Sequence, residues 1–325
     1  MNRYDVVALG ELLIDLTQNG FSNQGNPILE ANPGGAPCNV LAALSRLGHT
    51  TAFLGKVGRD GFGTQLQNAL TECGIDTRGL CFDEAHHTTL AIVHTGPHGA
   101  RDFSFYRDPG ADTMLRAQDL REEMIRSCRI FHFGSLSMTG EPARSATRRA
   151  LAIAEEAGVL RSFDPNLRPP LWPDLEQARS QILWGLGHCD ILKISDNEIQ
   201  WLTGFADFDA GIRWIQDRFP QIRLLFLTLG PQGSIACRGN LQIREPAFPV
   251  DAIETTGAGD TFLAGALHYI LQYGPEMPEP HLRQLLRFSN AAAAIITTRR
   301  GALRVAPSNE EILELLKEYS HDYQT

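Results

Sequence analysis

The alternation of short apolar segments with segments of helical periodicity is the feature that most constrains how this chain can fold. Residues 6–10 form an apolar run typical of a buried strand, and residues 37–47 carry apolar side chains at helical spacing before Gly48. Strands that alternate with helices form parallel sheets covered on both faces. The sequence therefore predicts an α/β fold with a mostly parallel sheet. Further strands are predicted at 51–54, 130–133, 161–164, 190–193 and 224–228, and further helices at 63–73, 142–157, 261–272 and 282–297.

Two stretches interrupt this alternation. Residues 17–31 are rich in Asn, Gln and Gly and have little helical period, and residues 88–106 hold two strand-like segments. The second stretch predicts a β-hairpin with its turn at residues 96–99. Because neither stretch has helical period, we expect both to form one small β-structure apart from the main sheet.

Composition and charge exclude several classes of protein. The formal net charge of −9 argues against a general nucleic-acid binder or a protein of anionic membranes, because both carry a basic excess. Apolar residues at 43% and charged residues at 21% are typical of a globular chain and argue against disorder. The apolar runs fall far short of the ~20 residues of a membrane span, no signal-peptide pattern precedes residue 6, and the cysteines form no C-x-x-C pair. We therefore expect a cytoplasmic protein.

A turn of small residues before a late helix is the most informative candidate site. Gly257, Ala258 and Gly259 let backbone N–H groups approach a ligand closely, and Asp260 follows at the first turn of an apolar helix. A helix N-terminus can hold a phosphoryl group, and a carboxylate beside it can take a proton from a hydroxyl. By spacing alone, the segment fits a Gly-rich turn capped by Asp260 equally well. A Rossmann motif is excluded because Phe262 stands where the third glycine would be, and the sequence has no P-loop.

Several segments, taken in order, resemble the PfkB (ribokinase-like) carbohydrate kinases. The matching segments are residues 251–262 for the C-terminal signature, 32–48 and 55–63 for the N-terminal signature, and 105–112, 164–168 and 193–204 between them. The resemblance spans residues from about 4 to about 310 and is greatest to the bacterial fructokinases. It implies a three-layer α/β/α ribokinase-like fold with a mostly parallel central sheet. It also implies one kinase domain over residues 1–325, with a β-sheet lid from residues 12–34 and 85–112.

The resemblance implies an enzyme that transfers the γ-phosphate of ATP to the terminal hydroxyl of a sugar. Fructose, giving fructose 6-phosphate, is the leading substrate, and 2-keto-3-deoxygluconate or a ribonucleoside is the alternative within the family. A non-catalytic sugar-binding protein is a third possibility, against which the intact Asp260 and its glycine turn argue. The expected partners are the sugar and ATP with Mg²⁺. The edges of an exposed lid sheet could also pair with a second copy to form a homodimer.

The resemblance also assigns roles to individual residues. Asp260 matches the catalytic base, and Gly257, Ala258 and Gly259 match the anion hole. The residues matched to the sugar are Asp15, Gly34, Gly35, Asn39, Arg107 and Arg168, and those matched to the nucleotide are Lys193, Thr228, Gly230, Gly233 and Asn290.

The metal-binding positions depart from the family pattern. Glu198 is expected to act on Mg²⁺ mostly through water, because Mg²⁺ keeps several waters. Ser195 replaces the family's Asn, and Ser195-x-x-Glu198 is also a capping box. Glu254 stands where many relatives have Asp in a loop for a monovalent cation, which leaves K⁺ activation open.

Overall fold

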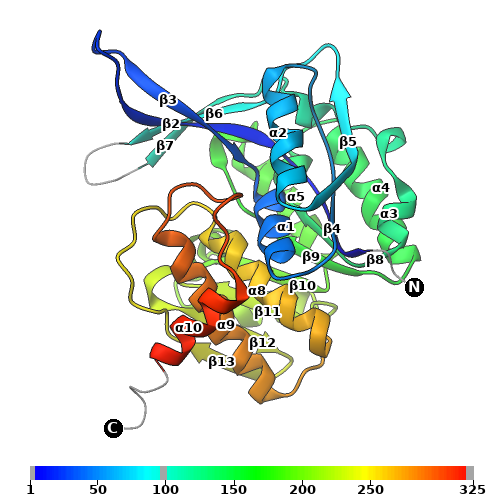
Figure 1. The fold of residues 1–325 in the computed structure, drawn as a ribbon. Coiled ribbons are helices and arrows are strands. Elements are labelled where there is room, and N and C mark those ends of the chain that lie inside the picture. The colour runs from blue at the N-terminus through cyan, green and yellow to red at the C-terminus, as the bar shows by residue number, and fades with distance from the viewer. Residues whose placement is uncertain (1–3, 96–100, 320–325) are drawn as a thin grey trace.

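A nine-stranded sheet forms the centre of the protein (Figure 1), in the order β13-β12-β11-β10-β9-β8-β1-β4-β5. The structure is a computed structural model and describes residues 4–95 and 101–319. From β11 to β5 all neighbouring strands pair in parallel, whereas β12 and β13 are antiparallel. The mostly parallel sheet predicted from the sequence is therefore confirmed. The strands are β1 (Tyr4–Leu9), β4 (Thr51–Gly58), β5 (Ile75–Asp83), β8 (Cys128–Gly134), β9 (Leu160–Asp164), β10 (Ile191–Ser195), β11 (Leu224–Thr228), β12 (Ser234–Arg238) and β13 (Leu241–Glu245).

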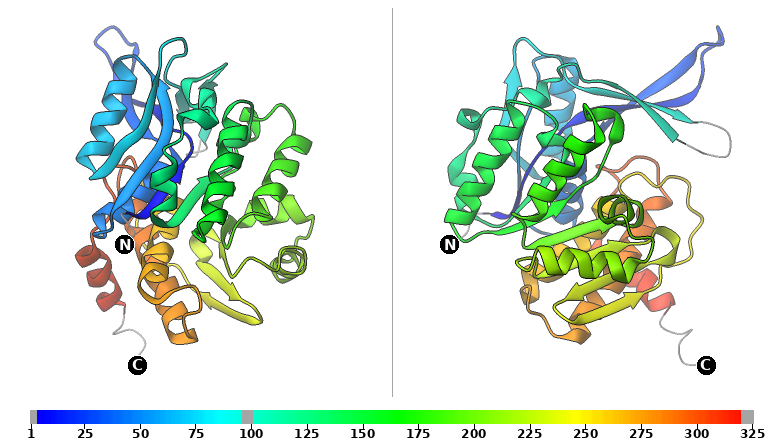
Figure 2. Two further views of the ribbon diagram at one scale, coloured as in Figure 1. Left: turned by 90° about the vertical axis from the view of Figure 1, so that its right-hand side faces the viewer. Right: turned by 180° about the vertical axis from the view of Figure 1, so that it is seen from behind.

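Helices cover both faces of the sheet (Figure 2). Because side chains alternate along a strand, Val7 and Leu9 of β1 pack into one apolar cluster, and Val6 and Ala8 pack into another. The first cluster is shared with α3 (Glu122–Arg126), α4 (Ala143–Glu156), α5 (Leu175–Leu186), α6 (Asp196–Thr203) and α7 (Phe208–Arg218). The second is shared with α1 (Ala36–Arg46), α2 (Gly61–Glu72), α8 (Ala258–Tyr273) and α9 (Glu279–Thr297). This is the three-layer arrangement that the sequence implied.

A second, four-stranded sheet extends from one side of the main body (Figure 1) and is called the lid sheet below. Its strands are β2 (Leu13–Phe21), β3 (Pro27–Gly34), β6 (Leu90–Thr95) and β7 (Arg101–Tyr106), in the order β3-β2-β6-β7. The pair β2/β6 is parallel, and the pairs β2/β3 and β6/β7 are antiparallel. The prediction of a small separate sheet is confirmed. The predicted turn at residues 96–99 lies outside the described residues.

Some elements differ from the sequence prediction. Strand β4 continues four residues past the predicted end at Leu54, to Gly58. Strands β5, β12 and β13 and the C-terminal helix α10 (Asn309–Glu318) were not predicted. β5 and β13 are the two outermost strands of the sheet, and their polar, half-exposed sequences lack the apolar run of a central strand.

Within residues 4–95 and 101–319, no helix combines the length and the apolar character needed to cross a lipid bilayer. This finding does not test the cytoplasmic location, which stays a prediction.

Candidate active site

A cavity of about 970 Å³ opens where the parallel strands of the main sheet end. Its wall includes Glu11 after β1, Leu136 after β8, Asn166 after β9, Ser195 at the end of β10 and Thr228 at the end of β11. The lid sheet contributes Leu13, Asp15 and Phe105, and the first turns of α1 and α8 complete the wall. Ligands of open α/β sheets bind at the carboxyl ends of the strands, so this is the expected position of a site.

Asp260 is a buried residue in the wall of this cavity and is held by α1. The amide Nδ2 of Asn39 donates a hydrogen bond of 2.8 Å to Asp260 Oδ2. Burial raises the pKa of Asp260, while the Asn39 bond and the charges of Lys193 and Arg168 lower it. The structure corrects one interpretation of the sequence: Gly257, with φ of 78°, is the N-cap of α8, and no side chain caps the helix. Asp260 is therefore available for chemistry instead of serving as a cap.

The glycine turn before Asp260 presents backbone to the cavity, with Gly257, Ala258 and Gly259 all in its wall. The first N–H groups of a helix have no partner within the helix and can bind an anion. The Ala258 N–H is an exception, since it donates to Thr255 O within the turn at 3.2 Å. A side chain on Gly259 would meet the Lys193 ammonium, because a Cβ there would lie 2.9 Å from Nζ. Because Gly259 has no side chain, the positively charged Lys193 ammonium can lie close to the backbone of the turn.

Lys193 belongs to a buried chain of charged groups. Its Nζ donates to Asp164 Oδ2 at 3.0 Å. Burial raises the pKa of Asp164 to about 6, with Lys193 opposing the shift. The charges of Asp164, Glu198 and Asp260 outweigh burial and raise the pKa of Lys193. The lysine therefore stays protonated beside the glycine turn.

Glu198 forms the capping box predicted for α6. Its Oε2 accepts bonds from the Ser195 backbone N–H at 2.9 Å and the Ser195 hydroxyl at 2.7 Å, and Oε1 accepts from Leu167 N–H at 2.8 Å. These bonds and Lys193 hold the pKa of Glu198 below its ordinary value despite burial. Glu198 also lines the cavity, so an ionised carboxylate faces the space next to the glycine turn.

The predicted sugar-side residues of β2, β3 and α1 meet around one turn. Asp15 lies against Gly34, where a Cβ would sit 2.2 Å from Asp15 Oδ2, so only glycine leaves room for this carboxylate. Gly35 has φ of 129° and is the N-cap of α1. Asp15, Gly35 and Asn39 line the cavity. Asn39 Oδ1 is buried and has no hydrogen-bond partner among the described residues.

The two predicted arginines differ in their surroundings. Arg168 is half-buried, lines the cavity and donates to the adjacent Leu167 carbonyl at 3.1 Å. Arg107, in contrast, does not belong to the described lining of the cavity. Its side chain is 4% exposed and pairs with the buried Asp112 at 2.6 Å. The guanidinium also donates to Thr139 Oγ1 and Leu136 O. The contact of Arg107 with the sugar stays a prediction.

The predicted nucleotide-side residues Thr228, Gly230, Gly233 and Asn290 all lie in the cavity wall. Asn290 Oδ1 accepts from Ser234 Oγ at 2.8 Å, and its Nδ2 donates to the carbonyls of Glu245 and Pro246 at 3.2 and 3.0 Å. Both amide hydrogens are thus used within the protein. The polar hydrogens of Asn290 therefore point into the fold. That Asn290 faces the adenine stays a prediction.

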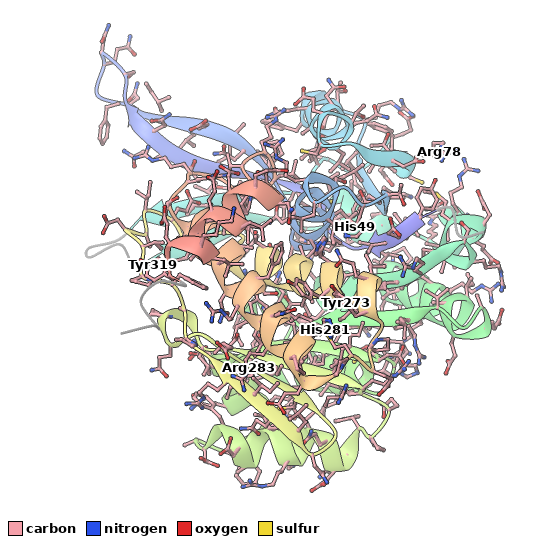
Figure 3. All side chains as sticks on the ribbon, turned by 60° about the horizontal axis from the view of Figure 1, so that its bottom comes forward. His49, Arg78, Tyr273, His281, Arg283 and Tyr319 are labelled. Atoms are coloured by element: carbon pink, nitrogen blue, oxygen red, sulfur yellow. The ribbon has the colours of Figure 1, made fainter. Side chains whose placement is uncertain are left out.

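An apolar loop that was not predicted forms part of the same wall, through Phe248 and Pro249. Tyr319, immediately after α10, donates to Pro249 O at 3.2 Å and packs edge-to-face on Phe248 with 5.4 Å between ring centroids. Figure 3 shows Tyr319 at the end of α10. No motif in the sequence indicates this contact, because it joins a loop to the end of a helix that lies about 70 residues further along the chain.

Glu254 lies near the end of α9. Its Oε2 accepts from Gly301 N–H at 3.2 Å, and the backbone N–H of Glu254 donates to Thr297 O at 3.0 Å. Glu254 therefore ties two loops together.

Comparisons with known proteins agree with this geometry. The family described as "pfkB family carbohydrate kinase" matches residues 3–309. Fructokinase-1 of Zea mays is 42% identical over 315 residues, which cover 96% of this chain and 97% of that protein. The crystal structure of fructokinase with bound ATP from Xylella fastidiosa is similar at a TM-score of 0.89 and 32% identity, covering 97% of this chain and 99% of that one. The fructokinase of Vibrio cholerae O395 in its fructose, ADP and calcium ion bound form gives a TM-score of 0.87 at 32% identity, covering 96% and 99%. This chain therefore belongs to the pfkB family of carbohydrate kinases, which are phosphotransferases with an alcohol acceptor.

Proposed function

We propose that this enzyme transfers the γ-phosphoryl group of ATP to the terminal hydroxyl of fructose and releases fructose 6-phosphate and ADP. The observation that carries the proposal is a single cavity that holds lid-side residues such as Asp15, nucleotide-side residues such as Thr228, and the buried carboxylate of Asp260. The relatives named fructokinase, one of them with fructose and ADP bound, support fructose as the acceptor.

Asp260 acts as the general base in this proposal. It takes the proton of the terminal hydroxyl while that oxygen attacks the γ-phosphorus. Its raised pKa brings the base closer to neutral pH, where proton transfer is more favourable, and Asn39 fixes the orientation of the carboxylate. The backbone of the glycine turn and the Lys193 ammonium behind it stabilise the negative charge on the transferring group.

The remaining residues bind the two substrates. Asp15 and the unpartnered Oδ1 of Asn39 accept bonds from sugar hydroxyls, and Gly34 and Gly35 let the backbone lie close to the sugar. Arg168 faces the transferring phosphoryl group. Arg107 holds the lid segment in place through Asp112. The nucleotide rests on Thr228, Gly230, Gly233 and the wall formed by Asn290.

Mg²⁺ is expected to enter with ATP. Carboxylate oxygens are the hard ligands that this ion prefers, and Glu198 presents an ionised carboxylate to the cavity. Since both of its oxygens already accept bonds from Leu167 and Ser195, we propose that Glu198 holds the ion through water. When bound, Mg²⁺ neutralises charge on the β- and γ-phosphates.

ADP release with Mg·ATP across fructose, ribose, adenosine and 2-keto-3-deoxygluconate tests the proposal. Fructose is expected to give the highest kcat/KM. Preference for adenosine or 2-keto-3-deoxygluconate would overturn fructose as the substrate and leave a kinase of another pfkB substrate. A folded protein that binds sugar but releases no ADP with any of them would favour a non-catalytic sugar-binding protein.

We also propose that two copies pair through their lid sheets. Large apolar side chains are exposed on this small sheet: Phe21 at 66%, Tyr106 at 63%, Ile28 at 47% and Leu29 at 42%. Exposed apolar side chains gathered on one small element are typical of an interaction surface. Light scattering after gel filtration should give the mass of a dimer, and a variant with Phe21→Ser and Tyr106→Ser should be monomeric. The control Leu175→Ser, at an exposed leucine of α5, should stay dimeric, whereas a monomeric parent would refute the pairing.

A further inference from the structure

Glu11 is a buried carboxyl group in the cavity that the proposed function does not use. It follows β1 and is 3% exposed, and its side chain belongs to the cavity wall together with Asp15, Gly35 and Asn39. The sequence analysis did not select it, because a single Glu after a strand carries no motif of its own. Its position on the sugar side of the cavity gives it access to the acceptor.

One oxygen of Glu11 is fixed by the protein. Oε1 accepts a hydrogen bond of 3.0 Å from the backbone N–H of Ala36, the first residue of α1. The preceding Gly35 lies directly on the Glu11 backbone, since a Cβ on Gly35 would sit 2.4 Å from Glu11 O. The carboxylate is thus held against the turn that Asp15 contacts at Gly34. Two carboxylates therefore flank the same glycine pair.

The second oxygen of Glu11 has no such partner. Apart from the Ala36 N–H, no other described residue donates a hydrogen bond to the Glu11 carboxylate. Burial raises the pKa of Glu11 to about 7, and Asp112 adds to the rise, while the backbone N–H of Glu11 itself, the Arg107 charge and the Ala36 N–H oppose it. Glu11 lines the cavity, so Oε2 can accept a hydrogen bond from a hydroxyl group that enters it.

We propose that Glu11 Oε2 accepts a hydrogen bond from a non-reacting hydroxyl of the acceptor sugar, which makes Glu11 a specificity-determining residue beside Asp15. This inference rests on the proposed sugar kinase function. At a pH above about 7 the Glu11 carboxylate is ionised, and the bond is then charge-assisted and stronger than a neutral one. Sugars that lack the partner hydroxyl would leave Oε2 unpaired in the closed site and bind less tightly.

The test is Glu11→Gln, examined with fructose and a set of deoxy analogues of fructose. Glutamine keeps the carbonyl that accepts from Ala36 N–H and replaces the acceptor Oε2 by an NH₂ donor. The fructose KM should rise by about 10-fold, the size expected for a lost hydrogen bond to a charged group. The KM for ATP should change by less than about twofold, and the melting temperature should not change. The KM for one deoxy analogue, the one that lacks the hydroxyl bound by Glu11, should not rise. In the matched variant Asp15→Asn, the analogue whose KM does not rise should be a different one.

Three results would overturn the inference: an unchanged fructose KM in folded Glu11→Gln, an equal rise in the ATP KM, or the same rise for every analogue. Turnover of fructose by the unaltered enzyme checks the proposed function separately.

If the variant fails to fold, the unaltered enzyme can be assayed about one pH unit below and above a pKa of about 7. Arg107, Asp112 and the Cys38 thiol surround Glu11, and Arg107 and Cys38 do not titrate there because both pKa values are raised. The fructose KM should be higher at the lower pH, and the analogue without the partner hydroxyl should lack this dependence; equal dependence would refute the contact.

Discussion

Replacing Asp260 by Asn separates the chemical role of this residue from any structural one. Asn keeps the shape of the side chain but cannot take the proton of the sugar hydroxyl. A positioned general base contributes about 10²–10⁴-fold, so kcat should fall by that factor, which corresponds to roughly 3–5 kcal/mol in the activation free energy. Binding of ATP should change little because the glycine turn is backbone.

The structure predicts that stability will not fall with activity. Asp260 does not cap α8, and an Asn at this position can still accept the bond that Asn39 donates at 2.8 Å. Lys193 keeps Asp164 as its partner at 3.0 Å. Because the folded pKa of Asp260 is raised above its ordinary value of 3.8, ionisation opposes folding as pH rises through the interval between these values. The variant lacks this penalty, so its free energy of unfolding above that interval should be no more than about 1 kcal/mol below that of the parent.

The assay pairs steady-state kinetics with denaturant unfolding on one preparation over a range of pH. The kcat of the parent should decline on acidification at a pH above 3.8, because the base is active only when ionised. A variant that turns over within about threefold of the parent, far inside the 10²–10⁴ expectation, would refute Asp260 as the base. A loss of stability of several kcal/mol would instead show that the charge supports the fold.

Other variants test the surroundings of the site. Arg107→Ala leaves the buried Asp112 without its positively charged partner, so denaturant unfolding should show a loss of about 3–5 kcal/mol in stability. The fructose KM should rise more than the ATP KM, and unchanged stability or equal rises in both KM values would contradict this role. Glu198→Gln removes the charge that faces the cavity, so a titration of activity with Mg²⁺ should show a higher requirement at saturating fructose, and an unchanged curve would exclude a role with the ion. Tyr319→Ala should raise the KM for ATP several-fold and leave the KM for fructose unchanged. Tyr319→Phe keeps the ring contact with Phe248 and loses only the hydrogen bond to Pro249, so its effect on the KM for ATP should be smaller. Equal changes in both KM values would indicate a general loss of structure.

The local sequence determined the parts of the fold that depend on neighbouring residues. Central strands such as β11 read as apolar runs because helices cover both of their faces, and helices such as α1 end where Gly48 follows. The shape of the glycine turn before Asp260 is also determined locally, because it depends on the residues within the turn. Strands β5 and β13 have no such signal, because an outermost strand gains its stability from pairing with a strand elsewhere in the chain.

Tertiary structure alone decided the chemical state of the site residues. Asp260 meets Asn39 across 221 positions of sequence, and Lys193 meets Asp164 only because β9 and β10 end side by side. The sequence identified Arg107 and Asn290 as ligand-binding side chains, yet packing turned the first into a buried ion pair with Asp112 and occupied both amide hydrogens of the second. Glu11 became a candidate only once Ala36 and Gly35 were seen against it. Charge, burial and available hydrogen-bond positions depend on which distant strand ends and helix turns meet, and no segment of the sequence specifies that meeting by itself.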